Sequence, residues 1–408
     1  MILLTGVLIV LSINNRYGWK TLSHHPLVIL IFVQFILFGF NIFTSIEPVL
    51  SFKYLLAKIW FIGSCVFIPI YCLREEKQFK NLFWGLFIGL LITVIYTVLR
   101  HATTGFGFED VNPSSKPFYL NHVNYSCFIA LIFPFVLASL GWYKVKSLQF
   151  AFIASCSALL LFAIVTSYTR TTWLSIILAS VSIVIFNTKY LKHSILLGLI
   201  AVFSFAYYLI DDNRYIKYAP DYQHTYFNQE DFEKHMEATV EMSDVSGMER
   251  VYRWVAAINL IEHHFWFGTG NNTFYPTYKE YANPAFVTYV SHNPEKSSTH
   301  NYFLLLFCDQ GVFGFLIFVV FYLWALIRSH TIYRSTDKIF IKTLMMASFA
   351  SLVIFLVHLA LGDMVEVDKT GGLFYLIIAL IIISDRMIKV PHLSSNASLS
   401  PEENTLKA

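Results

Sequence analysis

Charged residues are scarce in this chain of 408 residues. Asp, Glu, Lys and Arg make up only 13% of the sequence, and hydrophobic residues make up 56%. A soluble domain usually has roughly 25% charged residues. The shortage therefore excludes an ordinary soluble fold. We attribute the formal net charge of +3 to membrane topology and not to a nucleic-acid partner.

The cysteines of this chain indicate neither disulfide bonds nor a metal site. All five cysteines fall inside apolar stretches, whereas a disulfide framework would place them in external loops. No Cys and His spacing typical of a metal site occurs, and we expect no metal and no cofactor. No internal repeat occurs either, so the inverted-repeat plan of many transporters gains no support. The cysteines are Cys65, Cys72, Cys127, Cys156 and Cys308.

Long apolar stretches are what the chain has in abundance. A membrane-spanning helix needs about 20 mostly apolar residues, and ten stretches approach or reach that length. An eleventh, Ile2–Ile13, is about half as long and lacks the cleavage site of a signal peptide, so we interpret it as a short first helix. The sequence predicts an all-α integral membrane protein with a bundle of about 11 (10–12) transmembrane helices. The ten stretches are residues 27–44, 54–72, 81–99, 123–142, 149–168, 172–187, 194–210, 301–327, 340–361 and 370–385.

The distribution of Lys and Arg predicts the orientation, because cytoplasmic loops carry the excess of positive charge. With Met1 outside, sixteen Lys and Arg residues fall on the cytoplasmic side and five fall in the short external loops. This assignment places the one long loop outside. The predicted parts are N-terminal transmembrane helices (1–210), an external periplasmic loop (211–299), C-terminal transmembrane helices (300–386) and a disordered cytoplasmic tail (387–408).

The long loop is too aromatic to be disordered, and we expect it to fold. Residues Gln229–Met242 are charged and predict a surface helix. From Met248 to Phe265 apolar residues recur with the 3.6-residue period of an amphipathic helix, and Gly268 and Gly270 end it. We expect this helix to lie on the membrane surface or to pack against the bundle.

Three external positions carry candidate chemistry. His300 stands in Thr-His-Asn and is followed, after nine further residues, by Gly-Val-Phe-Gly. Arg250 precedes Trp254 by one helical turn, and Arg170 stands where a helix meets the outer surface. Each has a plainer interpretation: His300 as a helix cap, Arg170 as an arginine that extends to the interface, and Arg250 with Arg253 as charges that face lipid headgroups.

These motifs together resemble the O-antigen ligase and polymerase superfamily. The run from His300 to Gly314 is similar to the H-[NSQ]-x9-G-x-x-[GTY] signature of O-antigen ligases and matches every defined position. The segment from Arg250 to Gly270 resembles the Arg-xxx-Trp helix and the G-x-G turn that precede that histidine in the superfamily. Arg170 resembles the Ser-Arg or Thr-Arg step that begins the shared region, which covers roughly residues 166–325 here.

The resemblance implies a glycosyltransferase of the bacterial inner membrane whose active site faces the periplasm. The implied donor is an undecaprenyl-pyrophosphate-linked glycan. The implied acceptor is lipid A-core for a ligase, another lipid-linked glycan for a polymerase, or a Ser or Thr for a protein O-oligosaccharyltransferase. His300 would be the base that acts on the acceptor, and Arg170 and Arg250 would bind the donor pyrophosphate.

The chemistry of these side chains agrees with the implied roles. Guanidinium groups bind phosphate in bidentate fashion and never lose their charge. With an unperturbed pKa near 6.5, His300 would be about three-quarters neutral at pH 7 and able to accept a proton. A single base and a pyrophosphate leaving group imply one displacement with inversion and without a metal, whereas Glu249 and Glu262 look like ordinary surface residues and not like a glycosidase pair.

Weaker candidates complete the prediction. Asn301 and Arg253 could support the site, and His122 and Asn124 could contact the donor, although a capping role at that helix start is at least as well supported. The acidic loop residues are expected to be solvated. A lipid-linked glycan transporter is the alternative from another class, and it would place charged groups near mid-membrane. The acidic residues are Asp363, Glu366 and Asp368, and the mid-membrane candidates are Lys58 and His358.

Overall fold

The structure is a computed structural model that describes residues 23–212, 214, 245–288, 291–293 and 296–389. The predicted helices at Ile2–Ile13 and Gln229–Met242 and residues 390–408 of the predicted tail lie outside the described residues. The prediction that the disordered tail begins at residue 387 was wrong, because α17 continues to Lys389.

Every one of the ten predicted stretches within this part of the chain forms a helix. Nine of the described helices are long and apolar enough to cross a membrane, and Arg170–Phe186 is shorter. The chain is therefore an all-α polytopic membrane protein, as predicted. The helices are α3 (Pro26–Thr44), α4 (Pro48–Ile62) continued by η1 (Gly63–Phe67) and α5 (Ile68–Cys72), α6 (Glu76–Ala102), α8 (His122–Ser139), α9 (Leu148–Val165), α10 (Arg170–Phe186), α11 (Leu191–Ile210), α15 (Tyr302–Arg334), α16 (Ile339–Ala360) and α17 (Asp368–Lys389).

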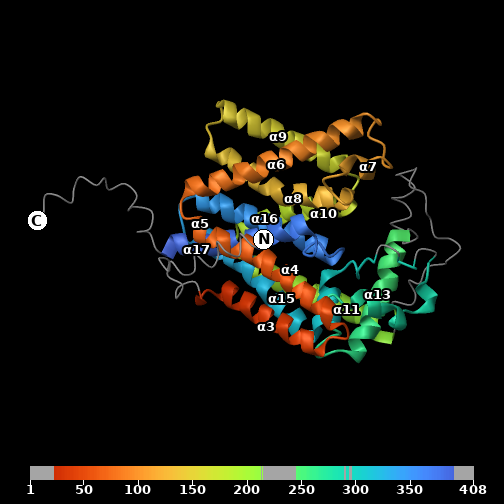
Figure 1. Cartoon of the computed structure of the whole chain (residues 1–408). Coiled ribbons are helices and arrows are strands. Elements are labelled where there is room, and N and C mark those ends of the chain that lie inside the picture. The colour runs from red at the N-terminus through yellow and green to blue at the C-terminus, as the bar shows by residue number, and fades with distance from the viewer. Residues whose placement is uncertain (1–22, 213, 215–244, 289–290, 294–295, 390–408) are drawn as a thin grey trace, which may run out of the picture.

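The core of the bundle is built around α16 and α17. In the most apolar 18-residue stretch of each helix, 67% and 78% of the residues are buried. Helix α16 packs against α8, α10 and α15. Helices α6 and α9 lie along one side of the bundle, and α3 lies along the opposite side (Figure 1). Helix α13 (Val245–His263) lies at one end, and α5 with the last turns of α17 lies at the other (Figure 1). We call these the α13 end and the α5 end.

Helix α15 is broken at Gly311, which the prediction of one continuous span over 301–327 missed. Gly311 has φ 66° and ψ −169°, a conformation that an L-residue rarely adopts. The break releases carbonyl groups of the preceding turn, and these accept hydrogen bonds from the turn that follows α13. The N–H groups of Thr269 and Gly270 donate to the carbonyl oxygens of Cys308 and Asp309, both at 2.9 Å.

Glycines allow the two backbones to approach this closely. A Cβ atom on Gly311 would lie 2.2 Å from the carbonyl oxygen of Trp266, and one on Gly268 would lie 2.4 Å from the backbone of Asp309. Asn41 of α3 bridges the same contact, because its Nδ2 donates to the carbonyl oxygens of Phe267 and Asp309. The glycines of both sequence motifs thus fix the end of α13 against the break in α15.

Lys58, a buried charge within the bundle, is paired. The Lys58 ammonium of α4 lies 2.9 Å from a Glu366 carboxylate oxygen, which also accepts a hydrogen bond from Tyr54. The Lys58 side chain is 1% exposed and that of Glu366 is 26% exposed. His358 lies 3.3 Å from the Thr172 hydroxyl. The expectation that Glu366 is a solvated loop residue was therefore wrong, because the loop between α16 and α17 brings it to Lys58.

We predict that Lys58→Met destabilises the protein by about 3 kcal/mol, because it leaves the Glu366 carboxylate without its cation in an apolar surrounding. The double variant Lys58→Met with Glu366→Gln should recover much of this loss. Thermal unfolding of the purified variants in detergent measures both. A single variant as stable as the wild type would contradict the importance of this pair.

We also predict that Gly311→Ala lowers stability by more than the roughly 1 kcal/mol of a typical point mutation, because the new Cβ meets backbone atoms that cannot rotate away. Gly89→Ala in α6 is the matched control, since its Cβ would have nothing within 4 Å. Unfolding temperatures of the two variants decide the matter. Equal effects would show that the contact at Gly311 is not a constraint.

Candidate active site

Helix α13 carries two charged side chains into the protein interior. Glu249 and Arg253 stand one turn apart, and their side chains are 7% and 6% exposed. The Arg253 Nη2 lies 3.1 Å from a Glu249 carboxylate oxygen. Such an i,i+4 pair neutralises both charges and makes their burial tolerable.

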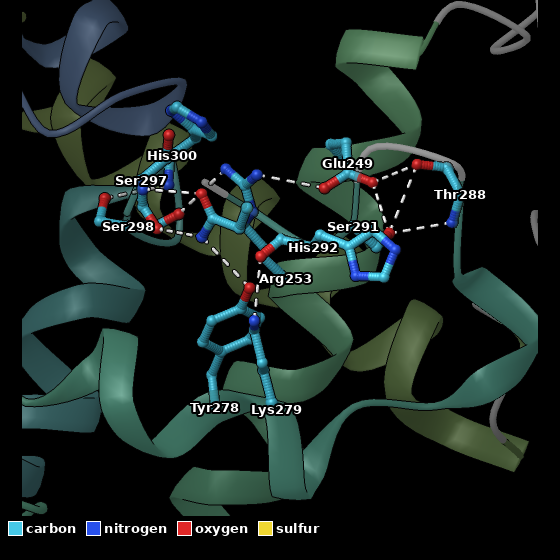
Figure 2. Close-up of polar contacts among 11 residues, drawn as sticks. Glu249, Arg253, Tyr278, Lys279, Thr288, Ser291, His292, Ser297, Ser298 and His300 are labelled. Carbon is cyan, nitrogen blue, oxygen red and sulfur yellow. Dashed lines mark hydrogen bonds and ion pairs between the residues drawn. The ribbon is translucent and has the colours of Figure 1, made fainter. Parts of the chain in front are cut away.

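The remaining oxygen of Glu249 accepts from two hydroxyl groups. Ser291 Oγ donates to it at 2.6 Å, and Thr288 Oγ1 donates to the same oxygen. On its other side, Arg253 donates from Nη1 to the carbonyl oxygen of Ser298 at 3.4 Å (Figure 2). The Glu249 and Arg253 pair therefore joins α13 to the segment 288–298 that leads to His300.

This arrangement corrects two predictions. Arg253 was expected to face lipid headgroups, and Glu249 was expected to be an ordinary surface residue; both are buried. The buried residues of α13 include Met248, Tyr252 and Ala256 together with Val255 of the predicted apolar face. Glu262, by contrast, is exposed as expected.

The segment before His300 is held by hydrogen bonds from the side-chain amide of Asn293. Asn293 donates from Nδ2 to the Tyr278 hydroxyl at 3.1 Å and to the Ser297 carbonyl at 2.9 Å. Its Oδ1 accepts from the Ser297 N–H at 2.8 Å. Asn293 has φ 50°, a conformation that asparagine tolerates better than most residues. The bond to Tyr278 joins η5 (Tyr278–Tyr281) to the loop before His300.

His300 is not the cap of the helix that follows it. Asn301 is the N-cap of α15, and its Oδ1 accepts from the N–H groups of Phe303 and Leu304 at 3.0 and 3.1 Å. His300 itself has φ 52°, and its N–H donates to Ser298 Oγ at 3.3 Å. Ser298 Oγ in turn donates to Asp363 at 2.8 Å. The helix cap is therefore Asn301, and the imidazole of His300 does not cap α15.

The electrostatic surroundings of His300 also differ from the prediction. Burial, together with the nearby cations Arg253 and Arg250, lowers the pKa of His300 from 6.5 to about 3. The ring is therefore neutral throughout the physiological pH range, and not only about three-quarters neutral. Asp363 responds in the opposite sense: burial raises the pKa of its carboxyl group.

Arg170 belongs to a second group at the start of α10. It is the first residue of that helix and lies close enough to His122, the first residue of α8, to act on it electrostatically. His122 Nδ1 lies 2.7 Å from Asn112 Oδ1. The N-cap of α8 is Asn121, whose side chain accepts from the Asn124 N–H at 2.9 Å. Asn124 is buried, so the capping role at this helix start is filled by Asn121.

Both groups lie at the same end of α16. Thr172, two residues after Arg170, contacts His358 near the end of α16, and Asp363, five residues after His358, accepts from Ser298 beside His300. The fold therefore brings the starts of α8, α10 and α15 and the buried side of α13 toward one region. His300, Arg250 and Arg253 form its inner cluster, and Arg170 with His122 forms its neighbour.

Sequence reasoning gave Arg253 only as a possible supporting residue, and it missed Glu249 and Asp363 as members of this region. A signal was present for the first two, since Glu followed by Arg four residues later is the spacing of an intrahelical ion pair. Asp363 carried no such signal, because its proximity to Ser298 comes from the packing of α16 against the bundle.

Part of this region matches a known protein family. A search of curated proteins found no match to the chain. Residues 151–319 match the family described as O-antigen ligase, a range that runs from α9 to the middle of α15. It includes Arg170, Arg250, Arg253 and His300. The match agrees with the resemblance inferred from the motifs and supports an O-antigen ligase-family assignment for this part of the chain.

Proposed function

We propose that this protein transfers a glycan from an undecaprenyl-pyrophosphate-linked donor to an acceptor hydroxyl group on the outer face of the bacterial inner membrane, with the α13 end facing the periplasm. Transfer inverts the anomeric carbon and uses no metal. The observation that carries the proposal is the position of His300 beside Arg250 and Arg253, which act on it electrostatically, within the O-antigen ligase domain.

The step is a single displacement. The acceptor oxygen forms a bond to the anomeric carbon while the bond from that carbon to the pyrophosphate oxygen breaks. His300 takes the proton of the acceptor hydroxyl, and the pyrophosphate leaves on its lipid with the bonding electron pair. Arg250 stabilises the charge that develops on the leaving group, because guanidinium groups hold phosphate oxygens at fixed geometry without titrating, and Arg253, held in its pair with Glu249, supports the site. Arg170 binds the same pyrophosphate from the start of α10.

The donor itself would strengthen the base. A neutral His300 with a pKa of about 3 accepts a proton poorly, and an ideal base has a pKa near the working pH. A bound pyrophosphate would offset the two cations that lower the pKa of the imidazole. His300 would then become an effective base only when donor is present, which limits the reaction to the loaded enzyme.

The acceptor we propose is lipid A-core, as for an O-antigen ligase. The same site chemistry would serve a polymerase, for which the acceptor is a second lipid-linked glycan, or a protein O-oligosaccharyltransferase, for which it is Ser or Thr. These alternatives share His300 and the arginines and differ in the acceptor that binds beside them.

A lipid-linked glycan transporter is less well supported. Its hallmark would be charged groups near mid-membrane that could follow a substrate. The two candidates, Lys58 and His358, are bonded to Glu366 and Thr172. A bonded pair inside the bundle supports a structural role, whereas the cationic cluster at the α13 end supports transfer chemistry.

We predict that His300→Ala lowers the rate of glycan transfer by about 10²–10⁴-fold, the usual loss for a general base, with little change in unfolding temperature. Asn301→Ala should behave in the opposite way, because loss of an N-cap costs about 1 kcal/mol of stability and leaves the base in place. The measurements are transfer by purified enzyme and thermal unfolding of both variants. His263→Ala, at an exposed position of α13, is the control. Full activity of His300→Ala would rule out its role as the base.

A further prediction concerns pH. Because His300 must be neutral to act and its pKa is lowered in the free enzyme, kcat/KM for the donor should stay flat as pH falls from 8 to about 5. Removing one cation in Arg253→Gln should raise the pKa of His300 and move the acid limb upward. In the wild type the acid limb of kcat, which reports the donor complex, should lie at higher pH than that of kcat/KM. A wild-type kcat/KM limb near 6.5 would contradict this electrostatic description.

A further inference from the structure

An apolar groove lies in the half of the bundle away from His300. Thirteen residues of α6, α8, α16, α17 and the turn η2 (Leu140–Trp142) line this groove, which is open on one side. All of these side chains are apolar except for the indole N–H of Trp142. Phe83 of α6 and Leu344 of α16 are examples. Leu86 of α6, also part of the lining, is 38% exposed.

The groove ends at a cationic rim. The Lys80 ammonium lies 5.5 Å from the centre of the Trp142 ring and 5.9 Å from that of Phe340, and both rings line the groove. Lys80 also pairs with Glu76 at 2.6 Å, but the Glu76 side chain is half exposed. A pair so solvated contributes little, so an anion could take over the lysine. Lys144 and Lys146 follow two and four residues after Trp142 and are exposed.

The indole of Trp142 supplies a second observation. Its Nε1 is buried and has no hydrogen-bond partner among the described residues. An unmade hydrogen bond of this kind costs free energy, and a tryptophan at a membrane interface usually directs its N–H to a polar group. An acceptor delivered by a ligand would remove the cost.

We propose that this groove binds one acyl chain of an anionic phospholipid, with the lipid phosphate at Lys80 and an acceptor oxygen at the Trp142 N–H. The apolar lining fits a hydrocarbon chain, and the position of Lys80 and Trp142 on one rim fits a negatively charged head group. The α5 end is rich in Lys and Arg, which attracts anionic lipids of the adjoining leaflet. The site is separate from the transfer reaction and does not depend on it.

The groove is distinct from the donor site. The donor pyrophosphate would lie at His300, before the start of α15, whereas Lys80 and Phe340 lie in the first turns of α6 and α16. These ends of the two helices are at the α5 end of the bundle (Figure 1). A head group at Lys80 therefore belongs to a lipid of the opposite leaflet.

Native mass spectrometry of the full chain, titrated with phosphatidylglycerol and phosphatidylcholine, tests the proposal. The wild type should bind phosphatidylglycerol more tightly. Lys80→Gln should weaken phosphatidylglycerol binding about fivefold, the factor for one lysine at about 1 kcal/mol, and leave phosphatidylcholine unchanged. Trp142→Phe keeps an aromatic ring but loses the indole N–H, and it should weaken the binding of both lipids. Leu86→Trp, at the exposed edge of the lining, should reduce binding of both by filling the groove.

Lys342→Gln is the matched control. Lys342 lies in the first turn of α16, where it pairs with Asp337 and covers the Tyr333 ring, away from the groove. Its loss should leave lipid preference intact. Equal binding of the two lipids by the wild type would overturn the proposal, as would an equal effect of Lys342→Gln and Lys80→Gln. So would displacement of phosphatidylglycerol by a polyprenyl phosphate at lower concentration than phosphatidylglycerol itself, which would assign the groove to the donor's lipid.

Discussion

The contact between the turn after α13 and the break in α15 is the constraint on which the candidate site depends. At Gly311 the helix opens, and the carbonyl oxygens of Cys308 and Asp309 accept from the backbone of Thr269 and Gly270. A membrane-embedded helix can release backbone groups only where another part of the protein satisfies them. The exchange fixes the distance and direction between α13, which carries the arginines, and the start of α15, which follows His300.

The charged side chains of α13 are held in a fixed orientation by a buried hydrogen-bond network. Glu249 neutralises Arg253 and is itself saturated by the hydroxyl groups of Thr288 and Ser291. The network leads through Ser298 to Asp363, so α13, the segment before α15 and the loop after α16 share one set of bonds. Rigid placement of cations is what recognition of a pyrophosphate requires, because electrostatic stabilisation costs least when the groups are already oriented.

The sequence was sufficient for the spans and insufficient for the contacts within them. Hydropathy placed the helix at 123–142 within a residue of α8 and η2, because twenty apolar residues leave few alternatives in a bilayer. The break at Gly311 was missed because hydropathy averages Asp309, Gln310 and Gly311 into one span; the backbone of Trp266 that approaches Gly311 is forty-five residues away in the sequence. Arg253 and Asp363 were misjudged for the same reason, since burial of a charge is decided by partners that only the fold assembles. The roles of His300, Arg250 and Arg170 stay predictions. The structure adds which neighbouring residues surround each of them.

The central claim is that bond cleavage occurs at the pyrophosphate of a lipid-linked donor, with transfer of the glycan. The most direct measurement is reconstitution of the purified protein in vesicles with an undecaprenyl-pyrophosphate-linked glycan and lipid A-core, followed by analysis of both products. The account predicts release of the lipid pyrophosphate in step with glycan attached to the acceptor, with the opposite anomeric configuration. Movement of intact donor across the membrane without release of lipid pyrophosphate would contradict it, and so would retention of configuration.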